Sequence, residues 1–175
     1  LYRTNAQSRL FESALLREGI PYRIVGSLRF YEREEVKDAL STLKLVANPR
    51  DEISFRRIIN KPTRGIGSKS VETIVGMVRH AGGDLLLAAE AAIQSLSKKA
   101  GGSVRRFLDV VQEARATLGA GRLSEFCERL LRDLGIWEHH EKNDDAITAR
   151  TKVENLEEFV NAASLYAADE AGVGE

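Results

Sequence analysis

A basic, glycine-containing stretch between residues 53 and 70 is the part of this chain best suited to chemistry. It holds five basic residues and no acidic one, and Gly65-Ile66-Gly67 lies at its centre. Glycine lets backbone N–H groups approach an anion closely, and the N-terminus of a following helix points its positive end the same way. The pattern predicts a phosphate-binding turn between two helices, the second capped by Ser68. The basic residues are Arg56, Arg57, Lys61, Arg64 and Lys69.

The same stretch also has a purely structural interpretation, because an αα-hairpin needs glycine for its turn whether or not it binds anything. The local charge favours binding, since the whole chain balances 26 Lys+Arg against 26 Asp+Glu and a local excess marks a polyanion footprint. We expect contact with duplex phosphates without base readout, Ile66 plugging the turn into the core. The expected binding residues are Lys61, Arg64, Gly65, Ile66, Gly67, Ser68 and Lys69.

Two further patterns are weaker. Lys98-Lys99 and Arg105-Arg106 flank a predicted Gly-Gly turn and form a second small basic patch, for which solvated surface is the favoured interpretation. His139-His140-Glu141 suggests a metal site, but adjacent histidines point apart on a helix, and no other His or Cys has ligand spacing. No nucleophile–base arrangement and no G-x-x-x-x-G-K-[ST] phosphate loop is evident. A stand-alone enzyme is therefore disfavoured.

The composition is that of a helix-rich chain with one sizeable core: 175 residues, 43% hydrophobic and 30% charged. A single cysteine, Cys127, fits a reducing compartment and a core position. No apolar run approaches the ~20 residues of a membrane span, and no signal peptide is evident. These features predict a cytoplasmic protein without a membrane partner. Because the chain starts abruptly at Leu1, we expect it to be an excised part of a larger protein.

Periodicity divides the chain into a short α/β stub and a helical remainder. Residues 1–4 and 21–26 are typical of strands, and a helix over about 6–18 lies between them. Too few strands are present for a stable sheet, so we expect the stub to belong to a sheet located elsewhere. Helices are predicted from about Glu34 to Asn48, from Asp51 to Asn60, over the apolar stripe Val71–Val78, from Asp84 to Leu96, from Ser103 to Leu118, from Ser124 to Leu134, and over Val153–Tyr166, with residues 138–150 as a polar loop.

Several segments, taken together, resemble one family. They are Tyr2-Arg3-Thr4-Asn5-Ala6-Gln7-Ser8-Arg9, Pro21-Tyr22-Arg23-Ile24-Val25-Gly26, Arg29-Phe30-Tyr31-Glu32-Arg33, Val36-Lys37-Asp38-Ala39-Leu40, Leu45-Val46-Ala47-Asn48-Pro49, Arg57-Ile58-Ile59-Asn60, Thr63-Arg64-Gly65-Ile66-Gly67 and Glu154-Asn155-Leu156-Glu157-Glu158-Phe159. In order and spacing they resemble a UvrD/PcrA/Rep-type superfamily 1 DNA helicase. Between about 80 and 150 only the helical pattern is similar.

The resemblance implies a division of the chain. Residues 1–35 would be part of the RecA-like motor subdomain 2A, and residues 36–175 most of the helical accessory subdomain 2B. Arg3, Thr4 and Asn5 would face single-stranded DNA, although from the residues alone a helix cap at Asn5 is the better interpretation. Phe30, Glu32 and Arg33 would lie at the 2A–2B junction. ATP and Mg²⁺ would bind elsewhere in the parent protein and not to this part.

The resemblance also assigns the Gly-Ile-Gly turn to duplex binding, in a helix-hairpin-helix. One departure from the general helix-hairpin-helix pattern is Val71, where a small residue is common. The first hypothesis is a duplex-binding regulatory module of an ATP-dependent 3′–5′ helicase acting in DNA repair or replication. The alternative is a protein-interaction or autoinhibitory module that docks partners or the motor and contacts DNA only incidentally. The implied partners are DNA, the rest of the helicase and repair or replication proteins.

Overall fold

The computed structural model describes residues 8–22, 30–142 and 145–172. Every regular element in these ranges is a helix, which confirms the mainly α fold class. The predicted strands at 1–4 and 23–26 lie outside the described residues, while Pro21 and Tyr22 are described and belong to no strand. The helix predicted in the stub is α1 (Ser8–Arg17).

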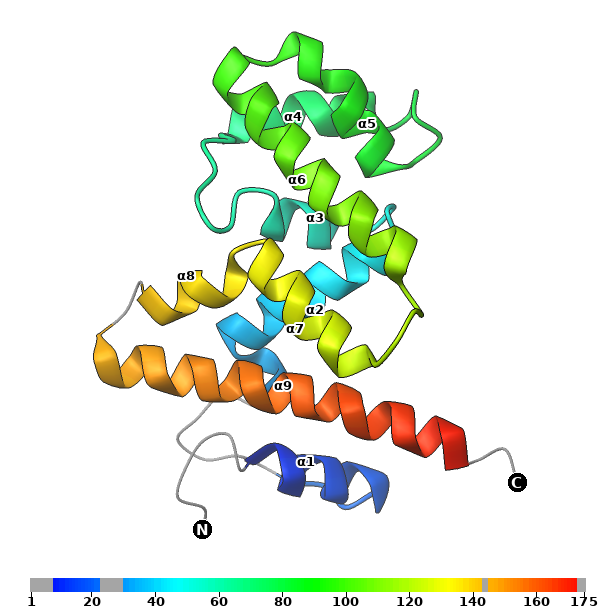
Figure 1. Cartoon of the computed structure of the whole chain (residues 1–175), viewed down its shortest axis with the longest axis vertical. Helices are drawn as coiled ribbons and strands as arrows, with labels where there is room; N and C mark the ends of the chain where they lie inside the picture. Colours follow the sequence, from blue (N-terminus) through cyan, green and yellow to red (C-terminus); the bar gives the residue numbers. More distant parts are fainter. Residues whose placement is uncertain (1–7, 23–29, 143–144, 173–175) are drawn as a thin grey trace.

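The helices form an elongated body with α9 (Ala146–Gly172) across one end (Figure 1). The half next to α9 contains α2 (Glu34–Ala47), α7 (Leu123–Asp133) and α8 (Ile136–Lys142), all packed on α9. The other half contains α4 (Ser68–Met77), α5 (Leu85–Ala92) and the short η3 (Ile93–Ser95). The long α6 (Lys98–Thr117) runs from α5 to α2 and α7, and thus joins the halves.

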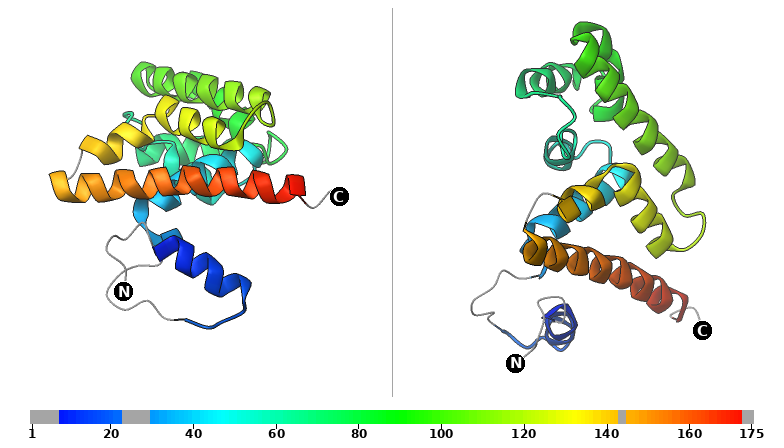
Figure 2. Two further views of the ribbon diagram at one scale, coloured as in Figure 1. Left: turned by 60° about the horizontal axis from the view of Figure 1, so that its bottom comes forward. Right: turned by 60° about the vertical axis from the view of Figure 1, so that its left-hand side comes forward.

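Two smaller elements complete the arrangement. Helix α3 (Glu52–Ile58) packs chiefly on α2, and η2 (Phe30–Glu32) leads into the N-terminus of α2. Helix α1 lies beyond α9, apart from the main body in both views of Figure 2. Its buried Glu12 accepts a hydrogen bond from the Phe30 amide at 3.3 Å, which links α1 to η2.

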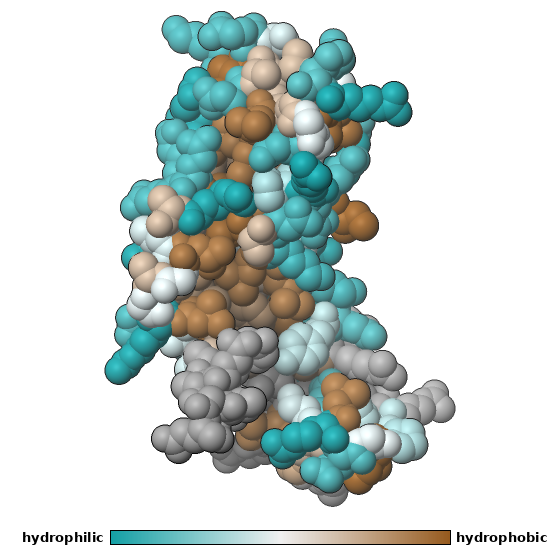
Figure 3. All heavy atoms as spheres, turned by 90° about the vertical axis from the view of Figure 1, so that its right-hand side faces the viewer, coloured by the Kyte–Doolittle hydropathy of each residue, from teal (hydrophilic) through white to brown (hydrophobic). Residues whose placement is uncertain are grey.

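One hydrophobic core extends through both halves of the body. Phe55 of α3 and Phe107 of α6 meet edge to face at 6.4 Å, a favourable arrangement for aromatic rings. Cys127 is buried, as predicted for a core residue, and Trp137 is buried as well. Apolar side chains also gather in a strip on the face that lies to the right in Figure 1 (Figure 3). No helix in the described part of the chain is long and apolar enough to cross a bilayer.

Two predicted helix starts are confirmed by cap geometry. The Asp51 carboxylate accepts the Ser54 amide at 3.0 Å, and the Asp84 carboxylate accepts the Leu86 amide at 2.8 Å. Each carboxylate satisfies an amide that has no partner inside its helix and faces the positive end of the helix dipole.

The predicted start of α6 at Ser103 is wrong. The helix begins at Lys98, with the Ser97 hydroxyl accepting the Ala100 amide at 3.3 Å, and Ser103 is buried inside it. Consequently Gly101 and Gly102 are helical, not a turn. A Cβ on Gly101 would lie 3.2 Å from the Ile93 carbonyl oxygen, so the glycine allows α6 to pass close to η3.

The predicted polar loop over 138–150 is also wrong for most of its length. Helix α8 covers residues up to Lys142, and α9 starts at Ala146. Three buried residues hold α8 against the body: Ile136 and Trp137 lie in the core, and His140 pairs with a buried carboxylate on another helix, as described below.

Candidate nucleic-acid interface

The Gly-Ile-Gly turn lies in the connection between α3 and α4, on the left side of the upper half of Figure 1. The Asn60 side-chain oxygen accepts the Arg64 amide at 2.8 Å and the Ile66 amide at 3.1 Å, so one side chain closes the loop. Ile66 is buried, as its predicted plugging role requires. The structure therefore adds Asn60 to the residues that shape the turn, a contribution that asparagine at a loop start only hints at.

The two glycines occupy different backbone conformations. Gly65 has φ of +75°, which side chains other than glycine adopt at a cost, and a Cβ there would lie 3.4 Å from Lys99 Cε. Gly67 has an ordinary φ of −74°, and a Cβ there would meet no atom within 4 Å. The space in front of Gly67 is thus open to a ligand.

The predicted Ser68 cap is wrong, because Gly67 is the N-cap of α4 and no side chain caps it. Ser68 is the first helical residue, so its hydroxyl sits beyond the amides that a cap would satisfy. The first amides of a helix have no intrahelical acceptor, and no described residue accepts from the amides of Gly67, Ser68 or Lys69. These donors face the open space and are suited to an anion.

Most of the predicted cations are engaged inside the protein. Arg56 forms a bidentate pair with Glu72, with its Nη1 atom 2.5 Å from Glu72 Oε1, and this pair bridges α3 to α4. The two helices otherwise pack chiefly on other partners, α3 on α2 and α4 on α5. The helix-hairpin-helix geometry therefore stays a prediction.

Two more of these cations, Arg57 and Lys61, form ion pairs with Asp38 of α2. It is fully buried, with Arg57 Nε 2.6 Å from one oxygen and Lys61 Nζ 2.6 Å from the other. His140 Nε2 lies 2.9 Å from the latter oxygen. Burial raises the pKa of Asp38, but the hydrogen bonds from His140 and Lys61 and the nearby positive charges outweigh it, so the pKa lies below its ordinary value. Lys61 also pairs with Glu34 at 2.5 Å.

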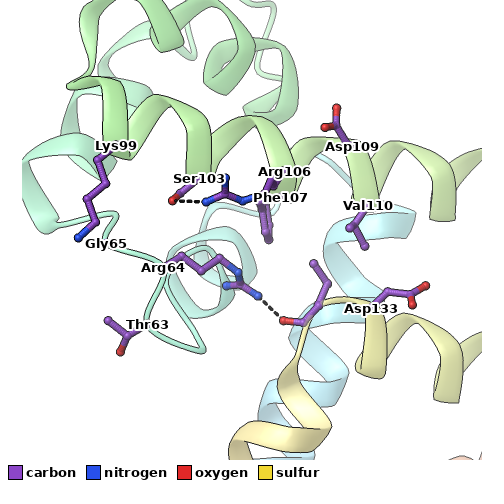
Figure 4. Close-up of a pocket in the computed structure, with 11 residues that line it drawn as sticks. Thr63, Arg64, Gly65, Lys99, Ser103, Arg106, Phe107, Asp109, Val110 and Asp133 are labelled. Atoms are coloured by element: carbon purple, nitrogen blue, oxygen red, sulfur yellow. Dashed lines mark hydrogen bonds between the residues drawn. The ribbon is translucent and has the colours of Figure 1, made fainter.

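Arg64 is directed away from the open face of the turn. Its guanidinium donates to carbonyl oxygens of the α3 end and to Leu134 O, 70 positions further along the chain. In Figure 4 a dashed line marks the hydrogen bond from Arg64 Nη2 to the Leu134 carbonyl, whereas Lys99 of α6 points toward Gly65. Burial lowers the pKa of Arg64 to about 10, which leaves it protonated at neutral pH.

Lys69, Lys99 and Arg106 have no ion-pair partner among the described residues, and Arg106 instead donates to the Ser103 hydroxyl at 3.1 Å. All three are exposed. Lys99 lines a groove of about 840 Å³ between the turn and α6, together with Thr63 and Arg106. Two carboxylates, Asp109 and Asp133, line the other end. Lys99 of the second basic patch thus lies next to the turn in the folded chain, a proximity that sequence spacing does not reveal.

Other sequence candidates are placed as follows. Arg3, Thr4 and Asn5 lie outside the described residues. Arg33, at the predicted junction, donates to Asn155 Oδ1 of α9 at 2.6 Å, and Phe30 is fully buried. Within the described ranges, no group of three or more His, Cys, Asp or Glu side chains could hold a metal ion.

The fold and the site define a mainly helical domain that carries a basic Gly-Ile-Gly turn. The chain belongs to the family described as the UvrD-like helicase C-terminal domain, whose model matches residues 1–173. The family-level resemblance drawn from the sequence motifs is thereby confirmed.

Individual relatives are similar over nearly the whole chain. DNA helicase II of Escherichia coli K12 is 37% identical over 172 residues, which is 97% of this chain and 24% of the relative. The ATP-dependent DNA helicase PcrA of Bacillus subtilis 168 is 37% identical over 167 residues, covering 95% and 22% respectively. PcrA of Staphylococcus epidermidis ATCC 12228 is 38% identical, covering 95% and 23%. The chain thus spans about a quarter of the length of these relatives.

Proposed function

We propose that this chain is a duplex-binding accessory part of an ATP-dependent 3′–5′ DNA helicase, and that the Gly-Ile-Gly turn grips backbone phosphates. The observation that carries the proposal is the open face of the turn. There, the amides of Gly67, Ser68 and Lys69 have no acceptor among the described residues, the Lys69 side chain is exposed, and Lys99 of α6 points toward Gly65. Amides and cations that converge on open space favour a phosphate.

The proposal assigns residues 36–175 to a 2B-like subdomain and residues 1–35 to part of 2A. The α1 surface supports the second assignment, because Leu10, Phe11 and Leu16 are each more than half exposed. Apolar side chains exposed around a helix in this way suit packing against further parts of a larger protein. On this proposal, Arg3, Thr4 and Asn5 of this chain contact single-stranded DNA, whereas ATP hydrolysis and Mg²⁺ binding belong to other parts of the cytoplasmic parent helicase.

A salt titration tests the phosphate contact directly. The 175-residue chain is titrated against a fluorescent duplex with a 3′ single-stranded tail, and log K is plotted against log salt. Each neutralised phosphate makes this negative slope steeper by about 0.9. We therefore expect the slope of the Lys69→Gln/Lys99→Gln variant to be shallower than that of the wild type by about 2. The control Lys98→Gln/Lys142→Gln changes the net charge equally at exposed positions and should leave the slope unchanged.

A protein-docking role is the second candidate, favoured by the apolar strip of Figure 3 and by the internal pairing of Arg56, Arg57 and Lys61. These two features reduce the free positive charge and leave apolar surface exposed. Absence of wild-type binding at low salt, with the fold intact by circular dichroism, would decide for this role and against duplex binding.

A further inference from the structure

We propose that Arg64 is a positioning residue, which holds the Gly-Ile-Gly turn against the C-terminal end of α7, so that DNA affinity depends on its hydrogen-bond geometry and not on its charge. The inference rests on the proposed duplex binding and deepens it. A basic residue next to the turn suggests a phosphate contact from the sequence, and the structure assigns it a different task.

The contacts of the Arg64 guanidinium are all internal. Nη1 donates to Ile58 O at 2.7 Å, Ile59 O at 3.1 Å and Lys61 O at 2.6 Å. Nη2 donates to Leu134 O at 2.5 Å. The guanidinium carbon also lies 5.4 Å from the ring centre of Phe107, within the range of a cation–π contact.

These acceptors are chemically suited to a cation. Ile58 ends α3 and Leu134 is the C-cap of α7, and the last carbonyls of a helix lack intrahelical donors and carry the negative end of its dipole. A single planar group therefore satisfies two helix ends at once. Since the two ends come from α3 and α7, the side chain fixes the turn relative to both of these helices.

A second contact supports the same anchor. Pro62 packs against Gly135, the residue after Leu134, because a Cβ added to Gly135 would lie 3.3 Å from Pro62 Cγ. Pro62 and Arg64 thus hold the loop that precedes the turn against the α7–α8 junction. Loss of these contacts would displace the amides of Gly67–Lys69, where we place the phosphate.

Lysine cannot replace this arrangement. An ammonium keeps the positive charge but is a compact point on a flexible stem, and it lacks the planar fork of donors that reaches carbonyls in different directions. A phosphate contact made by charge would survive Arg64→Lys, whereas the positioning role would not. The substitution therefore separates the two roles.

The experiment compares Arg64→Lys, Arg64→Gln and Lys69→Gln in the 175-residue chain, with Arg129→Lys, an exposed arginine of α7, as the matched control. We expect both Arg64 variants to weaken duplex binding by about tenfold or more, as for loss of a charged hydrogen-bond set, with the wild-type salt slope. Lys69→Gln should lower the slope by about 0.9, and Arg129→Lys should match the wild type.

Hydrogen exchange of the free chain provides a readout that does not depend on DNA. The Ile66 amide, which donates to Asn60, should exchange faster in Arg64→Lys, while the amides of α9 stay protected, which shows local loosening and not global unfolding. If both Arg64 variants fail to fold, Gly135→Ala disturbs the same seat through Pro62 and should weaken binding with an unchanged slope.

Any one of three results would overturn the inference. They are wild-type affinity in Arg64→Lys, a fall of the slope in Arg64→Gln as for a direct phosphate contact, and unchanged exchange of the Ile66 amide. Each of these leaves duplex binding by the wild-type chain intact. Absence of wild-type binding would instead remove the proposed function, and the effect of Arg64 on DNA affinity with it.

Discussion

At the scale of single residues, the two glycines of the turn are under different constraints. Gly65 needs its positive φ, so Gly65→Ser should cost about 1–2 kcal/mol of unfolding free energy. Gly67 is an N-cap with an open side-chain direction, so Gly67→Ser should change stability by less than about 0.5 kcal/mol. Urea unfolding measures both values.

The duplex affinity of Gly67→Ser then separates folding from binding. Its hydroxymethyl group would stand where we place the phosphate, so affinity should fall although the fold is retained. Wild-type affinity in this variant would contradict the assignment of the phosphate to the α4 N-terminus.

Glu34 predicts an acid-sensitive contribution to stability. Hydrogen bonding to Lys61, with further help from Lys152 and against a desolvation penalty, lowers its pKa from 4.5 to about 2. Because the unfolded chain then binds the proton more tightly, the contribution is complete above about pH 4.5 and is lost as the pH falls toward 2. Asp38 acts in the same direction.

The test is urea unfolding across this pH range. Glu34→Gln should flatten the acid limb of the stability curve, and Lys152→Gln should flatten it in part by removing one partner. An acid limb in Glu34→Gln as steep as that of the wild type would show that other carboxylates dominate.

Residue-scale prediction from the sequence succeeded where the signal was local. The Asp51 and Asp84 caps depend on amides two or three positions away, and the buried Ile66 follows from its place between glycines. The state of the cations could not be predicted, because Lys61 is paired by Asp38 of another helix and Arg64 by the backbone of α7. Charge counted along the chain thus overstated the free charge at the turn.

At the scale of elements, the two adjacent glycines of α6 form a natural matched pair. Gly102 faces open space, so Gly102→Ala should gain about 0.5–1 kcal/mol from helix propensity. Gly101 is buried with its Cβ direction 3.2 Å from the Ile93 carbonyl oxygen, a backbone atom that cannot rotate away.

Gly101→Ala should therefore lose that gain and be less stable than Gly102→Ala in thermal unfolding. Equal stabilisation by both substitutions would show that η3 yields easily to α6 and that the close approach is not a constraint.

The same pair explains an error in element prediction. A Gly-Gly dipeptide and a following serine are typical of a turn and a cap, yet α6 continues through them. Contact with η3 selects glycine there for its size. Likewise His140 in the polar 138–150 segment is buried because it pairs with Asp38 across 102 positions of sequence, which holds α8 on α2. Both errors arise where a tertiary contact decides the residue type, which periodicity in one segment cannot show.

At the scale of the whole molecule, Asn155 ties the start of the helical body to α9. It is buried, donates to Glu35 Oε1 at 2.6 Å, and accepts from Arg33 Nη1 at 2.6 Å, in contacts that span 120 and 122 positions. The amide suits this place because it offers a donor to a carboxylate and an acceptor to a guanidinium. These two hydrogen bonds of Asn155 therefore fix the position of η2 and the start of α2 relative to α9.

Asn155→Asp tests this link with a change of a single group. The new carboxylate keeps an acceptor for Arg33 but places an oxygen, not an N–H, against Glu35. Two buried carboxylates in contact should cost roughly 3 kcal/mol of unfolding free energy at neutral pH. Protonation of one of them restores a donor between them, so the loss should shrink as the pH is lowered.

Asn155→Ala serves as the control for this pH dependence. It removes the same hydrogen bonds without adding a charge, so its loss relative to the wild type should change little with pH. Because the variant carboxylate pair favours proton uptake by the folded chain, the deficit of Asn155→Asp must grow as the pH rises. A deficit that is constant with pH would mean that the introduced carboxylate is solvated in the variant, and hence that α9 moves away from η2 and α2 at little cost.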